Sequence, residues 1–296
     1  MPTSPKLRIG PAGWDYPSWQ RLLYPNPRPR GFHPLQFLAG LFDAVEINTS
    51  FYRPLRPELA RLWASQVASN PEFRFTAKLG RRFTHERVLE ESELREAIAG
   101  FVPLQDAGRL GCLLMQFPWS FRFTAENRDL LIRLRRAFHE FPLAAEMRHE
   151  SWMAPEALGV LVDYHIGFVN IDQPRTVRAM PPTSFLTTGT GYVRLHGRLA
   201  DPVTRAARSD YMFSLSELEE WKARIQRFHH LADSTYVVFN NNARARSAVN
   251  ALQLECLLGG THRRVPPALS SHWRVELASY PTHGPVQRDL FEQVAA

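Results

Sequence analysis

The chain has 296 residues, enough for one large domain or two ordinary ones, and its 44% hydrophobic and 22% charged residues are typical of a globular protein. No apolar run approaches the roughly 18 residues that a membrane span needs, and residues 1–10 lack the apolar stretch of a signal peptide. We therefore expect a cytoplasmic protein without a membrane partner. Cys112 and Cys256 lie in apolar segments outside any CxxC pair, which predicts reduced core residues and excludes a disulfide or cysteine-zinc site.

The formal net charge is +7, from 36 Lys plus Arg against 29 Asp plus Glu, and arginine far outnumbers lysine. Such a balance favours anionic partners, which include phosphates, nucleotides and nucleic acid. The alternative explanation is the composition bias of a GC-rich genome, because no dense basic run stands out in the sequence.

Eight short apolar segments recur along the chain, and helical patterns separate most of them. The predicted strands are 7–13, 44–50, 73–79, 112–117, 144–148, 167–172, 191–196 and 235–241. The predicted helices are 55–69, 90–102, 125–139, 214–231 and 243–258. Ser214 is the expected cap of the fourth helix, and Gly259-Gly260 ends the fifth.

Eight strands alternating with helices over about 250 residues predict an α/β fold, a single (β/α)8 TIM-type barrel, at residues 1–260. The stretch QPRTVRAMPPTSFLTTGT at 173–190 is too broken for a full helix, so we expect one degenerate crossover after strand 6. Residues 261–296 are expected to form a C-terminal extension or tail.

Polar and apolar side chains alternate in the second predicted strand, AVEINTS, where Glu46 and Asn48 follow Val45 and Ile47. Alternate residues of a barrel strand point to the barrel axis and to the helices, so Glu46 and Asn48 are expected at the axis. The same parity predicts further axis-facing polar residues at the strand ends: Thr76, Lys78, Gln116, Glu146, Arg148, Asn170, Asp172, Arg194, His196, Asn240 and Asn241. Active sites of barrels lie at this carboxyl end, which predicts a polar pocket there.

The charges of these residues suggest an anionic, phosphate-bearing ligand, which Lys78, Arg148 and Arg194 would bind. The candidate catalytic acids and bases are Glu46, Glu146, Asp172 and His196, with His149 as a further proton carrier. The other candidate ligand-binding residues are Trp14, Asn48, Tyr52, His85, Gln116, His149, Trp152, Asn240 and Asn241. Trp14, Tyr52 and Trp152 belong to a set of aromatic residues after strands, with Tyr16, Trp19 and Phe51, that could stack on a ring or base.

Two other interpretations of the same residues stay open. The acids and bases could form a satisfied ionic plug, although burying six charges costs free energy that apolar filling avoids. A divalent metal could bind His85, His149 or His196 together with the carboxylates. Cations in the same layers disfavour the metal, and no HxH or HExxH spacing appears, so no cofactor is predicted.

The motifs at these strand ends resemble one family across about residues 7–258. They are GPAGWDYPSW, FDAVEINTSFYR, FRFTAKLGRRFTH, LLMQFPWSF, AAEMRHESW, YVRLHG and VFNN. In order and content they are similar to the domain of unknown function 72 family, the YecE-like proteins. The resemblance implies a TIM-type barrel and implies no reaction, because the activity of that family is not established.

The sequence departs from the family pattern at two places. Pro11 and Ala12 stand where the family usually has hydroxyl residues, and Asn242 stands where a histidine often follows the paired asparagines. The second departure weakens the metal interpretation. The likeness of the family barrel to metal-dependent apurinic endonucleases is an analogy of fold and pocket.

Gln287-Arg288-Asp289-Leu290-Phe291 resembles the short peptide with which bacterial proteins dock on the DNA sliding clamp. Leu290 and Phe291 would fill an apolar pocket while Gln287 forms a hydrogen bond at its edge. Arg288 departs from the leucine that is usual at the second position. Alternatively, Leu290 and Phe291 anchor the tail on the barrel itself.

Three functions follow as hypotheses. The first is an enzyme, a hydrolase or lyase of unknown reaction, that acts by general acid/base chemistry on an anionic ligand or nucleotide. The second is a DNA-repair nuclease or lyase delivered by the tail, which predicts salt-sensitive DNA binding. The arginines around the mouth that would serve it are Arg81, Arg82, Arg198, Arg205 and Arg208. The third is a non-catalytic ligand sensor or adaptor.

Overall fold

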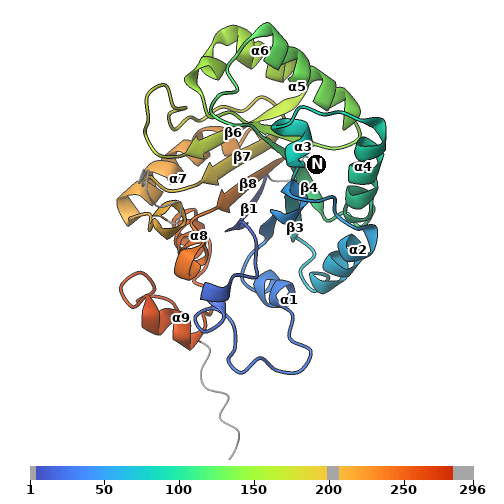
Figure 1. The fold of residues 1–296 in the computed structure, drawn as a ribbon. Helices are drawn as coiled ribbons and strands as arrows, with labels where there is room; N and C mark the ends of the chain where they lie inside the picture. Colours follow the sequence, from blue (N-terminus) through green and yellow to red (C-terminus); the bar gives the residue numbers. More distant parts are fainter. Residues whose placement is uncertain (1–4, 199–206, 283–296) are drawn as a thin grey trace, which may run out of the picture.

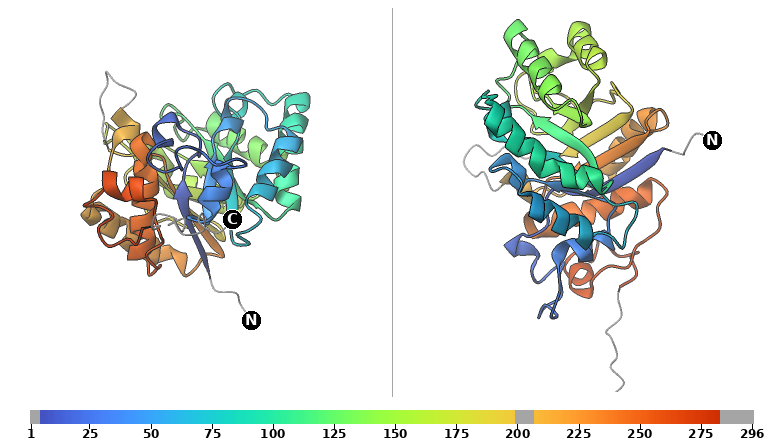
Figure 2. Two further views of the ribbon diagram at one scale, coloured as in Figure 1. Left: turned by 90° about the horizontal axis from the view of Figure 1, so that it is seen from below. Right: turned by 90° about the vertical axis from the view of Figure 1, so that its right-hand side faces the viewer.

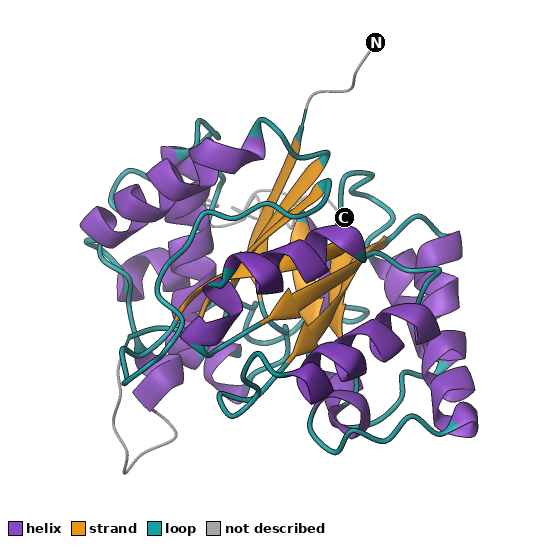
Figure 3. Cartoon of the chain, turned by 90° about the horizontal axis from the view of Figure 1, so that it is seen from above, coloured by secondary structure: helices purple, strands orange, loops and turns teal. Residues whose placement is uncertain are grey.

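Eight strands alternate with helices in a computed structural model that describes residues 5–198 and 207–282 (Figure 1). The strands lie at the centre and the helices around them (Figure 3). The strands are β1 Lys6–Pro11, β2 Ala44–Ile47, β3 Arg74–Lys78, β4 Leu110–Gln116, β5 Leu143–Glu146, β6 Ile166–Asp172, β7 Thr190–Leu195 and β8 Ser234–Phe239. All ladder pairings are parallel and the order is β1-β8-β7-β6-β5-β4-β3-β2.

The ring of strands closes between β1 and β2 at the carboxyl end. Ala12 forms a parallel bridge with Glu46, and the Gly13 amide donates to the Glu46 carbonyl oxygen at 2.8 Å. Lower down, β1 approaches β2 so closely that a Cβ at Gly10 would lie 1.8 Å from the Ala44 carbonyl oxygen. The predicted (β/α)8 barrel is therefore confirmed.

The helices begin where local sequence favours them. Ser214 and Glu217 form a capping box at α7, as the sequence predicted for Ser214, and Thr124 caps α5. The helices are α1 Pro34–Ala39, α2 Pro57–Gln66, α3 Arg81–Thr84, α4 Glu91–Asp106, α5 Ala125–Ala137, α6 Pro155–Asp163, α7 Leu215–His229, α8 Arg246–Leu257 and α9 Pro267–His272. The 3-10 turns are η1 Pro17–Trp19, η2 Thr49–Phe51, η3 Glu150–Met153, η4 Ala207–Asp210 and η5 Ala243–Ala245. In the described part of the chain, no helix is long and apolar enough to cross a membrane.

The crossover between β6 and β7 contains no helix, which confirms the degenerate crossover. One buried amide holds this loop to the strand: Asn170 donates to the Phe185 carbonyl oxygen at 2.9 Å and accepts from the Thr183 hydroxyl at 2.7 Å. The Phe185 amide also donates to Asn170, at 2.8 Å. Asn170 thus ties strand and loop together where other crossovers have a helix.

The predicted axis-facing positions of β6 are wrong. Ile171 pairs with Arg194 across the ladder and Val169 pairs with Tyr192, so the apolar residues share the inward face with those side chains. Asn170 and Asp172 occupy the outward face and bond to the loop and to α7. Strand β6 is buried on both faces, so alternation alone could not show which face is inward.

The C-terminal extension packs on the barrel over residues 261–282. Val265, Leu269 and Leu277 are fully buried there, and the Tyr280 hydroxyl donates to the Leu252 carbonyl oxygen of α8 at 2.8 Å. Both views of Figure 2 show this red segment against the orange α8. The tail motif at 287–291 lies outside the described residues, so both hypotheses for it stay open.

We expect Gly10→Ala to lower the free energy of unfolding by about 1–3 kcal/mol or more, because the added methyl group meets backbone that cannot move aside. The control is Gly159→Ala in α6, where a Cβ meets nothing within 4 Å and the free energy should rise by about 0.5–1 kcal/mol. Urea denaturation measures both. Equal effects of the two substitutions would contradict the close approach at Gly10.

Candidate functional site

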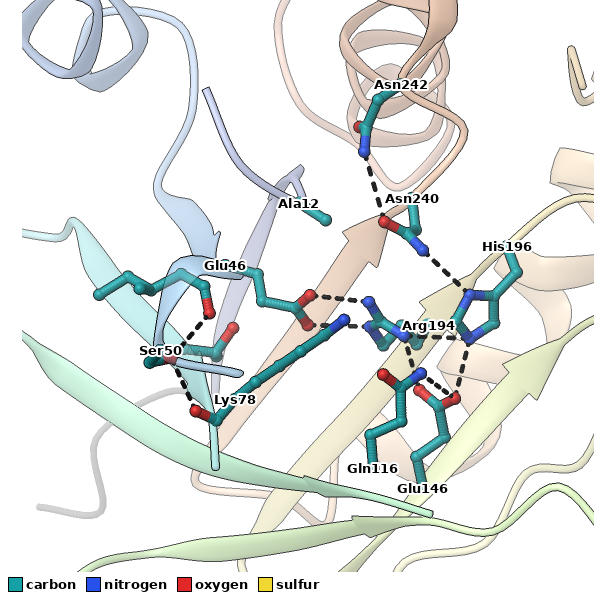
Figure 4. A network of polar contacts seen from close by, with 12 residues as sticks. Ala12, Glu46, Ser50, Lys78, Gln116, Glu146, Arg194, His196, Asn240 and Asn242 are labelled. Atoms are coloured by element: carbon teal, nitrogen blue, oxygen red, sulfur yellow. Dashed lines mark hydrogen bonds and ion pairs between the residues drawn. The ribbon is translucent and has the colours of Figure 1, made fainter. Parts of the chain in front are cut away.

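A buried arginine joins two carboxylates at the carboxyl end of the barrel (Figure 4). Arg194 of β7 donates to both oxygens of Glu46 on β2, from Nε at 2.9 Å and from Nη2 at 2.8 Å. Its Nη1 donates to Glu146 Oε2 of β5 at 2.8 Å. All three side chains are fully buried. The structure thus brings together three predicted site residues that are far apart in the sequence.

The other groups around the two carboxylates complete their hydrogen bonds. The Tyr192 hydroxyl donates to Glu46 Oε2 at 2.9 Å and accepts from the Thr76 hydroxyl at the same distance. Glu146 Oε1 accepts from Gln116 at 2.7 Å. Arg148 donates to that oxygen twice, from Nη2 at 2.8 Å and from Nε at 2.9 Å.

Both carboxyls remain ionised at neutral pH. Burial alone raises their pKa, but the neighbouring groups outweigh it: the charges of Arg194 and Lys78 lower the pKa of Glu46, and contacts with His196, Arg194 and Arg148 lower that of Glu146. Two carboxylates with lowered pKa and filled hydrogen bonds act as counter-ions. They cannot donate a proton near neutral pH.

His196 is neutral and held at both ring nitrogens. The Asn240 amide donates to Nδ1 at 3.2 Å, which leaves the ring proton on Nε2, where it donates to Glu146 Oε1 at 3.1 Å. Asn242 bonds to Asn240 Oδ1 at 3.3 Å and so fixes the orientation of the Asn240 amide. Burial lowers the pKa of His196 to about 4, against the opposing effect of Glu146.

Lys78, the last residue of β3, extends its side chain into this network (Figure 4). Among the described residues it has no carboxylate within ion-pair distance, and its ammonium lies 5.6 Å from the centre of the Phe51 ring. Burial, and next the charge of Arg194, lowers the pKa of Lys78 to about 7. Lys78 therefore titrates near neutral pH.

A cavity of about 560 Å³ opens over the strands from β5 to β8 and the loop after β1. Tyr16, Trp119, Arg148, His196 and Asn240 are among the residues that line it. The polar side chains nearest to solvent at the mouth are half-buried: Asn48, Lys78, Gln116, Arg148 and Asn240. Of these residues, Arg148 and Asn240 line the cavity, so a ligand there would meet them before the fully buried charges beneath.

Four predicted site residues lie away from this cluster. Asp172 accepts from Trp221 Nε1 of α7 at 2.7 Å and from Arg198 at 2.8 Å, and Asn241 donates to Asn250 of α8 at 2.9 Å. Trp152 is fully buried and stacks on Phe121. His149 is buried and bonds to Ser151 at 2.9 Å. The first two residues point outward from their strands, so they attach helices and loops to the barrel.

The remaining predicted residues surround the mouth on the side of β2 and β3. Trp14 packs edge-on against Trp63, His85 lies edge-on to Phe51, and Tyr52 is 74% exposed. Asn48 has a buried side-chain oxygen with no hydrogen-bond partner in the described structure. Such an unpaired buried acceptor is uncommon in folded proteins.

Tyr192 and Trp119 are among the residues of the site that were not predicted from the sequence. Tyr192 lies two residues before Arg194 on the same strand face, so the alternation that predicted Arg194 could also have found it. Trp119 is 40% exposed and lines the cavity, with the Arg122 guanidinium 5.3 Å from its ring. Trp119 could have been predicted from the sequence, because it follows directly after a predicted strand, where loop residues line the barrel mouth.

No group of three or more metal-ligating side chains gathers within residues 5–198 and 207–282. The carboxylate oxygens of Glu46 and Glu146 already accept hydrogen bonds from arginine, tyrosine, glutamine and histidine side chains. The possible divalent metal therefore remains an untested hypothesis, and the described residues offer no set of ligands for it.

The fold and site define a TIM-type barrel with a buried Arg–carboxylate layer under a polar cavity. The chain belongs to the family described as "Protein of unknown function DUF72", which it matches over residues 8–273. This confirms the family that the motifs indicated.

The relatives include proteins known from sequence and from structure. UPF0759 protein YunF of Bacillus subtilis is 28% identical over 274 residues, which cover 85% of this chain and 94% of that protein. UPF0759 protein YecE of Escherichia coli is 30% identical over 150 residues, half of each chain. The crystal structure of the DUF72 protein TM1631 of Thermotoga maritima has a TM-score of 0.73 at 29% identity, covering 86% of this chain and 99% of that one. A DUF72 protein of Enterococcus faecalis has a TM-score of 0.77 at 25% identity, covering 86% and 96%.

We expect Arg194→Met to lower the free energy of unfolding by about 3–5 kcal/mol, because it leaves two buried carboxylates without their cation. Arg61→Met on the exposed face of α2 is the control and should change it by less than about 0.5 kcal/mol. Adding Glu46→Gln to Arg194→Met should recover part of the loss. Chemical denaturation measures all three, and an Arg194→Met loss no larger than the control would refute the network.

The pH dependence of stability gives a separate test at His196. Its pKa is about 4 in the folded protein against an ordinary 6.5, so the unfolded chain binds the extra proton between these values. The free energy of unfolding should therefore fall as the pH drops from 6.5 toward 4. The His196→Gln variant should fall less steeply in that window and run parallel to the wild type above pH 7. Parallel curves throughout would show that His196 does not titrate as the structure indicates.

Proposed function

We propose that the protein is an enzyme that binds a small anionic ligand, bearing a phosphate or carboxylate group, in the mouth cavity and acts on it by acid/base chemistry. The observation that supports this most directly is a charge imbalance at the mouth. When Lys78 is protonated, it stands with Arg148 and Arg194 against two carboxylates, because Asp172 is bonded to Arg198 and Trp221 on the outer side of β6. An anionic ligand would balance the extra cation.

Arg148 is the residue best placed to meet the ligand. It lines the cavity and its side chain is 23% exposed. Nε and Nη2 are bonded to Glu146, whereas Nη1 has no partner among the described residues. Its backbone is held in place because the carbonyl oxygen accepts from the Met180 amide at 2.9 Å and from Gln173 at 3.0 Å. A fixed guanidinium with a free donor suits an oxyanion.

Lys78 is the proton carrier that the geometry favours over the carboxylates of the sequence prediction. Glu46 and Glu146 stay ionised and fully bonded, and both nitrogens of His196 are engaged. The pKa of Lys78 is lowered to about 7 by burial and by Arg194, and general acid/base catalysis is most effective when the pKa lies near the working pH. His196 becomes a second carrier if a ligand displaces Asn240 from Nδ1.

The alternative hypotheses have less support from the side chains in place. Arg81, Arg82 and Arg198 hold carboxylates, with Glu86, Glu93 and Asp172 among their partners, so these charges are already compensated. Arg205 and the side chain of Arg208 lie outside the described residues, as does the tail. DNA binding, clamp docking and a sensor role therefore stay predictions.

We expect Arg148→Gln to weaken the binding of inorganic phosphate roughly 10- to 100-fold, because charge-assisted hydrogen bonds contribute about 1.5–3 kcal/mol. The matched control is Arg61→Gln, which removes the same charge from an exposed position on α2. Isothermal titration calorimetry with phosphate, and separately with a carboxylate such as pyruvate, measures both variants. Wild-type protein that binds neither anion would sink the proposal, as would equal weakening by the two substitutions.

A further inference from the structure

Lysine is rare in this chain, and one of its lysines lies in the candidate site. Only three of the 36 basic residues are lysines: Lys6, Lys78 and Lys222. Lys6 forms an ion pair with Glu72 at 3.4 Å and Lys222 pairs with Glu219 at 3.1 Å. Lys78 has no carboxylate partner in the described structure. Almost all basic residues of this chain are arginines, yet the basic residue at the end of β3, under the barrel mouth, is a lysine.

The neighbouring groups leave the Lys78 amine without an acceptor. Arg194 and Tyr192 occupy the oxygens of Glu46, the carboxylate that acts most strongly on the charge of Lys78. Glu146 is saturated by Arg194, Gln116, Arg148 and His196. The Phe51 ring lies beside the ammonium, and the Ser50 hydroxyl fixes the Lys78 carbonyl oxygen at 2.7 Å. The backbone of Lys78 is therefore fixed, whereas its Nζ has no hydrogen-bond acceptor in the described structure.

We propose that Lys78 is a nucleophile that forms an imine with the carbonyl carbon of a small anionic aldehyde or ketone. The inference rests on the proposed function: Arg148 binds the anionic group and Lys78 attacks the carbonyl group of the same molecule. An arginine could supply the charge at this position, but only an amine can lose its proton near neutral pH and form the bond. Arg194 close to Lys78 disfavours the ammonium form and so keeps part of the amine neutral.

The step balances without any further reactant. The lone pair of the neutral Lys78 amine forms the C–N bond, and the π pair of the carbonyl group moves to its oxygen. That oxygen takes one proton from the amine nitrogen and one from the medium, then leaves as water with the C–O bonding pair. The product is a protonated imine that keeps one N–H. Its positive charge withdraws electrons from the adjacent carbon, which is the chemistry of lysine-dependent lyases and isomerases.

The first experiment compares the three lysines within the full-length protein. Reductive methylation with formaldehyde and cyanoborohydride at pH 7, read by peptide mass spectrometry, reports how readily each amine forms an imine. We expect Lys78 to react at least ten-fold faster than Lys6 and Lys222, whose amines are engaged in ion pairs with Glu72 and Glu219. Equal or slower reaction at Lys78 overturns the inference.

The second experiment tests the substrate class. The protein is mixed with pyruvate, glyoxylate or dihydroxyacetone phosphate and reduced with borohydride, with acetone as the uncharged control. We expect a reduced adduct on Lys78 with at least one anionic carbonyl compound and much less with acetone. A carboxylate-only or phosphate-only pattern identifies the anionic group. Arg148→Gln should lower the yield, and Lys78→Arg should abolish it, with circular dichroism of both variants used to check that they keep the wild-type fold.

The outcomes separate this inference from the proposed function. Phosphate binding without any adduct on Lys78 overturns the imine and leaves the anion pocket standing. Adducts that survive in Lys78→Arg, or that form equally on Lys6 and Lys222, also overturn it. If the wild-type protein binds neither phosphate nor pyruvate and forms no adduct, both the proposed function and the imine fall.

Discussion

The structure depends on one buried guanidinium. Arg194 can remain in the barrel only if its charge is matched and its donors are filled, since removing a cation from water costs several kcal/mol. Glu46 and Glu146 supply the match from strands on either side, so β2, β5 and β7 must keep their register for the three side chains to meet. A shift of one residue in any of these strands would turn its charged side chain toward the helices. The network therefore specifies the barrel as well as the floor of the cavity.

The same network determines which donor atoms of Lys78 and Arg148 remain without a partner. Because Arg194 takes both oxygens of Glu46, Lys78 has a nearby negative charge but no partner to bond with. Because Glu146 uses its oxygens on four donors, Arg148 is held in place by one side of its guanidinium and keeps Nη1 free. Which donors at the mouth remain free thus follows from how completely the oxygens of Glu46 and Glu146 are hydrogen-bonded.

Much of this could be predicted from the sequence, for reasons that particular residues make clear. The barrel follows from eight repeats of strand and helix, and Glu46, Lys78, Gln116, Glu146 and Arg194 follow from alternation in strands where polar and apolar residues differ. Asp172 was misplaced because β6 is buried on both faces, so its inward side is decided by pairing with β7 and not by polarity. The free amine of Lys78 could not be predicted, since it depends on hydrogen bonds that residues more than 100 positions away make with Glu46.

The connection between β6 and β7 lines the cavity but contributes no helix to the outer layer of the barrel, whereas a βα connection usually does both. Gln173, Pro174 and Thr176 at its start line the cavity, yet the loop is fastened to the strand through Asn170 and carries no helix that the outer layer requires. Side chains of this loop that do not hold Arg148, as Gln173 does, can change while the buried ion pairs and the strand register stay as they are. Substitutions in this wall should accordingly change the lining of the cavity at a lower cost in stability than substitutions in the buried charges.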